Sequence, residues 1–503
     1  MLGRISRGIS KNSIRRLSRL QQALPVHIST LANGLRVVTD PTPGHFSALG
    51  TYIDAGTRHE TAANSGVAHM LDRMAFKSTQ NHTGVQMMEL LARLGGNYMC
   101  GAQRELVLYQ ALVFHQDVGR MLECMAQTVR APLLLEAEVG EARATAAYEL
   151  AELAHKPEVN LVEALHARAY GAQGLGMPLY GLDKSVAALG RGDVAAYHAH
   201  YYVPERTVVA MVGVDVAAAE KMAQSLFGDW KPQQKKAEKA EKAEQEKAKK
   251  AAAYVGGELA LPYVAPRYAN LPPLVHMQIA FESAGLLSSD LYALATLQKL
   301  LGGGLSFSAG GPGKGMFLRL FRVLNQYPFV ENCLCFHHAY SDLGLFGITL
   351  SCYVDQAEYM AQIACHELAK VMETDVGRGG ITEQELRRAK NQLVLSLLMN
   401  VESKLAALED IGRQVQCQGK VTSVDEMVEH IERLTVADVR AVAQKVLQGL
   451  GNGEGLATPT VVMQGDRAPF GDVEFVLRYF GLGRWKGEAP QEPRDYLKRR
   501  RWF

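Results

Sequence analysis

The chain has 503 residues, of which 48% are hydrophobic and 21% charged, and its formal net charge is +2. This length predicts two to four domains, and this composition excludes a mostly disordered or collagen-like chain. No uncharged apolar run reaches the ~18 residues that a membrane-spanning helix requires. The seven cysteines form no CxxC pair, which argues against a disulfide framework or a zinc ribbon and fits a reducing compartment.

The N-terminal segment is basic and free of acidic residues. The first acidic residue is Asp40, and residues 1–24 contain six basic ones, Arg4, Arg7, Lys11, Arg15, Arg16 and Arg19. Serines lie between them, and apolar residues recur at roughly helical spacing, which is typical of a mitochondrial transit peptide. We therefore expect residues 1–24 to be a transit peptide, and the alternative is a basic arm that binds nucleic acid.

Two further segments are basic. Residues 235–250 carry seven Lys and four Glu and predict a solvated linker between domains. Residues 484–503 carry seven basic and three acidic residues and predict a solvated tail. Without the three basic segments the rest of the chain has a net charge of about −11. An acidic body attracts cationic partners and repels nucleic acid, so no nucleic-acid partner is expected.

The segment before the linker, residues 25–234, predicts an alternation of strands and helices. Strands are expected at residues 27–31, 35–39, 46–55 and 207–214, and helices at 138–153 and 194–201. Asn33-Gly34 signals a tight turn between the first two strands. Ser65 is the expected N-cap of a further helix, and Thr83 with Gln86 has the capping-box spacing of another.

The segment after the linker, residues 251–483, repeats this order. Strands are expected at residues 276–282, 333–337, 346–352 and 460–464, and helices at 290–301, 382–400 and 436–447. Both segments close with Asp-Val, a helix, a loop and a Thr-Val-Val strand. The repetition predicts an α+β fold of two duplicated domains, each a mostly antiparallel mixed sheet covered by helices.

Residues 69–73 match an inverted zinc motif only in part. That motif is H-x-x-E-H on a helix: its two histidines point from one face to one metal ion, and its glutamate activates the attacking water. Here His69 retains the first ligand, Asp72 replaces the glutamate with a shorter side chain, and Arg73 replaces the second histidine. Arginine is a permanent cation that cannot ligate zinc, so we do not expect this chain to hydrolyse peptides alone.

This segment and several others resemble the α-subunit branch of the mitochondrial processing peptidase family, a catalytically inactive branch of the inverzincin, or pitrilysin-like, proteins. The matching strings are SGVAHMLDRMAFKST, GHFSALGTYIDAGTRHE, LGGNYMC, VLNQYPFVENC, AKNQLVLSLLMNVESKLAALEDIGRQV and TVVMQGDRAPFGDVE. They lie between residues 31 and 482, so the resemblance covers nearly the whole chain after the expected transit peptide. It implies the processing-peptidase, LuxS-like metallohydrolase fold.

In the catalytic β subunits of that family a glutamate on a later helix is the third zinc ligand, and its position corresponds to Glu149. A catalytic zinc site needs three protein ligands and an open position. The resemblance therefore implies no catalytic residue and no metal in this chain, with zinc expected in the partner β subunit. His69, Asp72, Arg73 and Glu149 are the degenerate positions, and we expect His69 and Glu149 to pack or to pair with Arg73.

A glycine-rich segment follows the predicted helix at 290–301. It consists of Gly302, Gly303, Gly304, Leu305, Ser306, Phe307, Ser308, Ala309, Gly310, Gly311, Pro312, Gly313, Lys314 and Gly315. Its spacing does not fit a phosphate loop, so a nucleotide site is not expected. In the similar α subunits this loop takes part in substrate binding, with glycine at the position of Leu305 and tyrosine at that of Phe317. We expect it to bind substrate, and the alternative is a surface loop without a role.

Two acidic residues and two cysteines complete the candidates. Glu383 and Glu385 begin a predicted helix, where their simplest role is capping and support of the helix dipole. Because acidic residues of the similar α subunits bind basic presequences, both are weaker substrate-binding candidates. Cys333 and Cys335 lie two apart on a predicted strand, so we expect both in the core on one face.

The resemblance implies a non-catalytic subunit that forms a heterodimer with a zinc-bearing β subunit in the mitochondrial matrix. It would help bind the basic N-terminal presequences of imported precursors, while the partner cleaves them. The alternative is a structural core subunit of the ubiquinol–cytochrome c reductase, peripheral to the matrix side of the inner membrane, and one protein can have both roles. An independently active metallopeptidase conflicts with Arg73.

Overall fold

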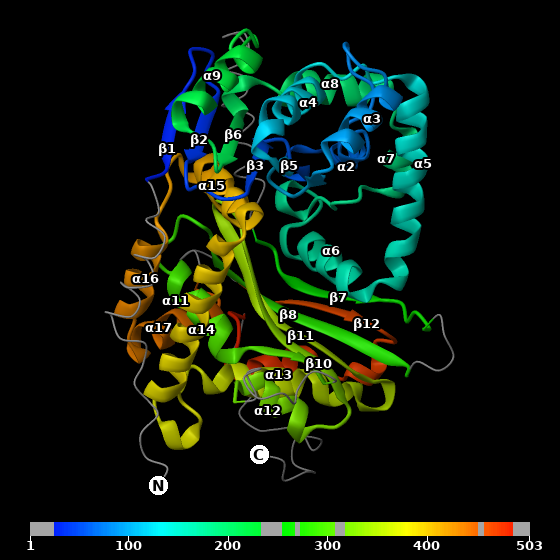
Figure 1. Cartoon of the computed structure of the whole chain (residues 1–503). Coiled ribbons are helices and arrows are strands. Elements are labelled where there is room, and N and C mark those ends of the chain that lie inside the picture. Colours follow the sequence, from blue (N-terminus) through cyan, green and yellow to red (C-terminus); the bar gives the residue numbers. More distant parts are fainter. Residues whose placement is uncertain (1–24, 233–253, 267–271, 307–316, 451–456, 486–503) are drawn as a thin grey trace.

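The computed structural model describes residues 25–232, 254–266, 272–306, 317–450 and 457–485 (Figure 1). The expected transit peptide at 1–24, the expected linker at 235–250, residues 307–315 and most of the expected tail at 484–503 lie outside these residues. These assignments, and the domain boundaries at 25–234 and 251–483, stay predictions. None of the described helices is long and apolar enough to cross a membrane.

The first half of the chain forms a six-stranded sheet in the order β1-β2-β6-β3-β5-β4. Its strands are β1 (His27–Thr30), β2 (Arg36–Asp40), β3 (Phe46–Ile53), β4 (Asn97–Ala102), β5 (Val107–Phe114) and β6 (Thr207–Val212). β2 and β6 are parallel, and all other neighbours are antiparallel. The predicted turn joins β1 to β2: Gly34 has a φ of 91°, and the Asn33 side chain accepts the amide hydrogen of Leu35 at 3.2 Å.

The second half repeats this sheet in the order β7-β12-β8-β11-β10-β9. Its strands are β7 (Gly257–Leu261), β8 (Leu274–Ala284), β9 (Gly303–Leu305), β10 (Val330–Ala339), β11 (Leu343–Tyr353) and β12 (Thr460–Gln464). Again one pair, β7 with β12, is parallel and the others are antiparallel. The series β2-β6-β3-β5-β4 thus has the same pairing as β7-β12-β8-β11-β10. The predicted α+β fold of two duplicated mixed sheets is confirmed.

Helices surround both sheets. Those of the first half are α2 (Val67–Arg73), α3 (Gly84–Leu94), α4 (Val118–Arg130), α5 (Glu136–Glu152), α6 (Pro157–Tyr170), α7 (Asp183–Ala188), α8 (Arg191–Tyr201) and α9 (Val216–Phe227). Those of the second half are α11 (Leu291–Leu301), α12 (Arg319–Gln326), α13 (Met360–Lys370), α14 (Glu383–Glu402), α15 (Lys404–Gln418), α16 (Val424–Arg433), α17 (Val436–Leu447) and α18 (Val473–Tyr479). The capping boxes predicted at Thr83 with Gln86 and at Thr382 with Glu385 are confirmed at the starts of α3 and α14.

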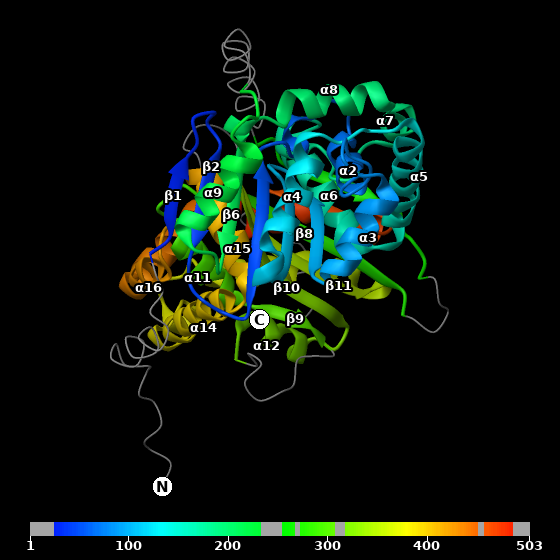
Figure 2. The same ribbon diagram turned by 45° about the horizontal axis from the view of Figure 1, so that its top comes forward.

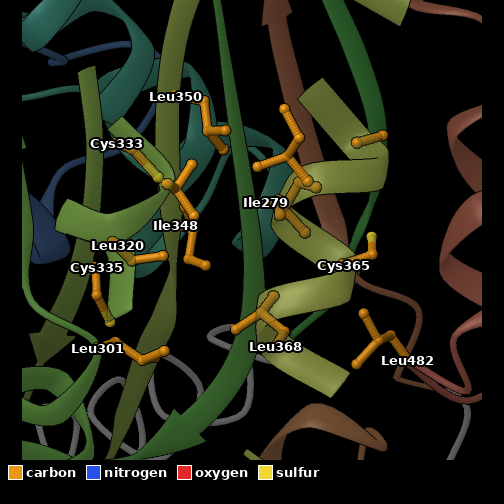
Figure 3. Packing of buried hydrophobic residues seen from close by; sticks show 14 of the residues in the cluster. Ile279, Leu301, Leu320, Cys333, Cys335, Ile348, Leu350, Cys365, Leu368 and Leu482 are labelled. Carbon is orange, nitrogen blue, oxygen red and sulfur yellow. The ribbon is translucent and has the colours of Figure 1, made fainter. Parts of the chain in front are cut away.

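Each sheet packs one face against helices of its own half. The first core lies between the first sheet and helices that include α2, α4 and α5, and the second core between the second sheet and helices that include α11, α12 and α13. Figure 3 shows Cys333 and Cys335 in the second core near Leu320 and Ile348. The two thiols are at most 2% exposed, which confirms their predicted place in the core.

The opposite face of each sheet is covered by a helix from the other half (Figure 1). On the first sheet, α15 buries Leu408, Ile411 and Val415 against side chains that include Tyr52. On the second sheet, α6 buries apolar side chains such as Leu165 against β8, β10, β11 and β12. Each fully buried aliphatic side chain contributes ~1.5–3 kcal/mol, so this exchange of helices ties the two halves firmly together.

Buried polar contacts join the halves beside α6. The Arg58 guanidinium is 2.7 Å from the Glu105 carboxylate and donates to Asp342 in the second half at 2.9 Å. The His166 ring accepts a hydrogen bond from the Tyr340 hydroxyl at 2.7 Å, and its other nitrogen donates to a backbone carbonyl. Burial lowers the pKa of His166 well below its usual range, so the ring stays neutral and remains an acceptor.

Candidate functional site

The degenerate zinc motif lies on α2, whose N-terminus is fixed by a buried acid. Glu60 is 5% exposed, and its carboxylate accepts the amide hydrogens of Gly66 at 2.8 Å and Ala68 at 2.9 Å. Burial raises the pKa of Glu60 to about 8, although the two backbone hydrogen bonds oppose this rise. The prediction that Ser65 caps this helix was wrong. The N-cap residue is Gly66, which has a left-handed conformation and no side chain that could form a capping hydrogen bond.

His69 lies at the centre of the site. It is 4% exposed, and its Nε2 atom is 2.7 Å from Oε2 of Glu149 on α5. The Tyr180 ring packs against the imidazole with a centroid distance of 5.0 Å. The residues at the expected first and third zinc-ligand positions are therefore brought together, and they contact each other directly.

Arg73 connects the acidic groups of the site. Its Nε atom is 3.4 Å from Oε2 of Glu149, and its Nη2 atom is 3.3 Å from Oδ2 of Asp72. The side chain is 38% exposed, so the guanidinium lies at the mouth of the site rather than in its interior. One cation thus lies beside two carboxylates and balances part of the negative charge that a metal ion would otherwise balance.

Asp72 stands at the position of the general base but contacts the edge of the sheet. Its Oδ2 atom accepts the backbone amide hydrogen of Ala102 at 3.4 Å, and its side chain is 9% exposed. Burial raises the pKa of the neighbouring Cys100 thiol, and the charge of Asp72 adds to this rise. The acid that replaces the glutamate is therefore held between β4 and Arg73.

These donors do not fit a catalytic zinc ion. His69 and Glu149 provide two ligands, and the third position is held by Arg73, which cannot coordinate a cation. In the described part of the chain, no group of three or more His, Cys, Asp and Glu side chains is placed to hold a metal ion. The arrangement is a cluster in which Arg73 stands where a third zinc ligand would be needed and pairs with Asp72 and Glu149.

The start of the glycine-rich segment is a strand. α11 ends at Leu301 with Gly302 as its C-cap, and Gly303, Gly304 and Leu305 form β9 against β10, where a loop was predicted. Gly303 has a φ of 104°, and a Cβ atom there would lie 2.1 Å from the carbonyl oxygen of Cys333. A Cβ atom on Gly302 would lie 2.4 Å from Leu318. Gly303 thus allows the backbones of β9 and β10 to approach closely, and Gly302 allows the chain to pass close to the Leu318 side chain.

The two weaker acidic candidates have different surroundings. Glu385 closes the capping box of α14 and is 3.0 Å from the buried Arg319 guanidinium, which also donates to the Gly379 carbonyl at 2.8 Å. Burial opposes ionisation of Glu385, but the hydrogen bonds and charge of Arg319 outweigh it and lower its pKa. Glu383 is exposed at the same helix start. The structure therefore gives Glu385 a structural role and leaves Glu383 accessible.

Glu60 and Tyr180 contribute to the site, although sequence reasoning missed both. Neither lies at helical spacing from His69, and each reaches the site through a loop that closes only in the folded chain. A buried acid that caps a helix across a loop has no local sequence signature.

Two family models match the chain. The model described as "Insulinase (Peptidase family M16)" matches residues 36–183, and the model described as "Peptidase M16 inactive domain" matches residues 188–393. The chain belongs to peptidase family M16. The second model begins before the expected linker and covers most of the second half, which agrees with two related halves.

Curated relatives support this assignment. The "Mitochondrial-processing peptidase subunit alpha" of Neurospora crassa is 41% identical, over 87% of this chain and 86% of the relative. The "Probable mitochondrial-processing peptidase subunit alpha" of Schizosaccharomyces pombe is 40% identical, over 91% and 89%. The human "Mitochondrial-processing peptidase subunit alpha" is 32% identical, over 85% and 81%. The resemblance expected from the motifs of this M16 chain is confirmed.

Proposed function

We propose that this chain is the non-catalytic subunit of a mitochondrial processing peptidase. In this proposal it forms a heterodimer with a β subunit and helps hold the presequence of an imported precursor. The partner's zinc would supply the activated water that cleaves the peptide bond. The proposed location is the mitochondrial matrix, in line with the names of its relatives.

The observation that carries the proposal is the state of the M16 zinc site. Arg73 occupies a ligand position and pairs with Glu149, while Asp72 is turned to Ala102. A chain with an arginine at a zinc-ligand position retains the frame of a peptidase without its chemistry. Such a chain is suited to position a substrate for an active partner.

Charge supports the kind of substrate proposed. With its basic segments set aside, the chain has a net charge of about −11, and presequences are basic and poor in acids. An acidic surface increases the local concentration of a cationic peptide and speeds its capture. The affinity should therefore fall as ionic strength rises from about 0.01 M to about 0.15 M, because the Debye length shortens from ~30 to ~8 Å.

The test is reconstitution from separately purified chains. A fluorescent precursor peptide is incubated with this chain, with the β subunit, and with the two together. We expect efficient cleavage only by the pair, and peptide binding by the pair that weakens with salt. Cleavage by this chain alone would refute the non-catalytic role.

Purification of the tagged chain from mitochondria separates the proposed function from the structural alternative. Co-purification with a β subunit and processing activity supports the proposal. Co-purification with cytochrome reductase subunits, without any processing activity, would favour a structural core subunit instead.

A further inference from the structure

β9 is the end strand of the second sheet and lies next to α12 (Figure 2). One edge pairs with β10, with Leu305 opposite Asn332 and Gly303 opposite Leu334. In the described part of the chain no strand pairs with its other edge. A free strand edge offers backbone donors and acceptors that an extended peptide can use.

Two exposed leucines lie on one face of this sheet end. Leu334 is opposite Gly303, and Leu305 lies two residues beyond Gly303, so alternation along the strands places both leucines on the same face. Leu305 is 57% exposed and Leu334 is 39% exposed, whereas Cys333 and Cys335 point to the core on the opposite face. Diagonal neighbours on adjacent strands are close enough for one apolar side chain to contact both.

A carboxylate lies beside this leucine pair. Glu331 is at the irregularity of β10 between Val330 and Asn332. One of its oxygens accepts a hydrogen bond from the Tyr353 hydroxyl at 2.8 Å. The other accepts a hydrogen bond from the hydroxyl of Ser306, the residue after β9. The pKa of the Tyr353 hydroxyl is raised by its hydrogen bond to Glu331, so Tyr353 stays a donor.

Among the described residues Glu331 has no cationic partner. Within the described ranges no Lys, Arg or His side chain forms an ion pair with it, although other acids of this half, such as Glu385, have one. Two neutral hydroxyls hold the carboxylate in place and leave it able to accept further hydrogen bonds. A positioned carboxylate without a cation suits an arginine side chain, which donates two parallel hydrogen bonds.

We propose that Glu331, Leu305 and Leu334 form a subsite for the presequence. Glu331 binds an arginine side chain, and the two leucines contact an apolar side chain of the same extended peptide. Glu331 and Leu334 are three residues apart on β10, which corresponds to ~10 Å, so the two peptide side chains lie about three residues apart. This inference rests on the proposed function and names residues that set its specificity.

The test uses the full chain paired with its β subunit and three labelled peptides. The first peptide is acid-free, with arginines about three residues from leucines. In the second every arginine is glutamine, and in the third every leucine is serine. Fluorescence anisotropy measures the affinity of each peptide for the unmodified pair and for pairs that carry Glu331→Gln or Leu334→Ser.

We expect Glu331→Gln to weaken binding of the first peptide about tenfold and to leave the affinity for the glutamine peptide unchanged, because only arginine uses the charge. Leu334→Ser should weaken binding of the first peptide about threefold and leave the affinity for the serine peptide unchanged. The matched controls are Glu358→Gln, which removes the same charge from an exposed position, and Leu287→Ser, which alters a leucine that is 65% exposed. Both controls should bind like the unmodified pair.

Each alternative outcome has a definite meaning. Equal losses for the arginine and glutamine peptides would show that Glu331 only supports the fold, and unchanged affinity in Glu331→Gln would exclude it from the site; either result refutes the subsite and leaves the proposed function intact. Failure of the unmodified pair to bind the first peptide would refute both. Melting temperatures of all variants establish that the chain remains folded.

Discussion

The two halves share one sheet topology but differ at the helix that follows the third strand of the shared series. After β3 in the first half comes α2, with His69, Asp72 and Arg73. After β8 in the second half comes α11, whose inward side chains, including Leu297 and Leu300, are fully buried core residues. One copy of the frame retains the positions of a polar site, and the other copy uses the same helix only for packing.

The sheet ends differ in the same way. In the first half the Ala102 amide on the end strand β4 is bound by Asp72. In the second half the end strand β9 is made of Gly303, Gly304 and Leu305 and has an unpaired edge among the described residues. In the proposed function, one half of the duplicated fold has lost its chemistry while the other half supplies a binding surface, because the site and not the fold determines function.

The largest difference between the two halves is expected in zinc binding at the degenerate site of the first half. We expect the unmodified chain to bind well under one zinc ion and the double variant Asp72→Glu, Arg73→His to bind one. His69, Glu149 and the new histidine would provide the three ligands that a catalytic site needs. At zinc concentrations 1,000-fold above Kd, binding should stabilise the variant by ~4 kcal/mol. Atomic absorption and melting temperatures with and without a chelator measure both effects.

Two controls sharpen this test. Arg73→Gln removes the cation without adding a ligand and should bind no zinc, and adding His69→Ala to the double variant should abolish its zinc binding. Stoichiometric zinc in the unmodified chain would contradict the assignment of Arg73 as the residue that closes the site.

The next largest difference between the two halves is expected in their loss of stability at low pH. Burial lowers the pKa of His276, His337, His338 and His366 in the second half to about 4. Among the described residues of the first half, burial lowers the pKa of His198 to about 4 and that of His166 well below its usual range. A histidine with a lowered pKa binds fewer protons in the folded state than in the unfolded state. It therefore stabilises the folded state fully above its usual pKa of 6.5, and this stabilisation is lost as the pH falls toward about 4. At pH 5.5 each well-buried ring costs ~1 kcal/mol and the more exposed His366 costs less, so the cost is ~3–4 kcal/mol in the second half and ~2 kcal/mol in the first.

Tryptophan fluorescence can follow each half. Trp230 packs against the first core and Trp485 against the second, so variants that retain one of them report on one half. We expect the urea midpoint reported by Trp485 to fall more between pH 7 and pH 5.5 than that reported by Trp230. Equal shifts would indicate that the exchanged helices make the two halves unfold as one unit.

A smaller loss of stability is expected where a helix of one half packs on the sheet of the other. A Cβ atom on Gly412 of α15 would lie 2.2 Å from the Tyr52 ring of the first sheet, so Gly412→Ala should separate the helix from the sheet and cost ~2 kcal/mol. Gly140→Ala on α5 is the matched control, since its Cβ atom meets nothing within 4 Å. That control should be neutral or stabilise by ~0.5 kcal/mol. Denaturant unfolding measures the stability of both variants. Equal stability would show that α15 packs less tightly against the first sheet than the distance to Tyr52 indicates.

Local patterns in the sequence predicted much of this fold. The Asn33-Gly34 turn and the capping boxes at Thr83 and Thr382 depend on residues within a few positions of each other, and the structure contains all three. The pairing of His69 with Glu149 depended on the family resemblance, because 80 residues separate them. Contacts across the chain were the ones missed: α15 was not among the expected helices, and an amphipathic pattern alone would not predict that the first sheet covers it.

The same limit explains β9. Three residues that begin with two glycines have low strand propensity, and only their pairing with β10 makes them a strand. Glu60, which caps α2 from outside the helix, was missed for a similar reason, since its contact forms only when the intervening loop closes.

The smallest expected effect compares one glycine in each sheet end. Gly303 on β9 has a φ of 104°, and a Cβ atom there would lie 2.1 Å from a backbone oxygen, so Gly303→Ala should strain the strand and cost ~1–2 kcal/mol. Gly101 on β4 has only the Leu108 side chain near its Cβ position, at 3.8 Å, so Gly101→Ala should change stability by less than ~0.5 kcal/mol. Hydrogen exchange of the β10 amides should rise in Gly303→Ala alone. A stable Gly303→Ala variant with protected β10 amides would show that the packing of β9 against β10 does not require glycine at this position.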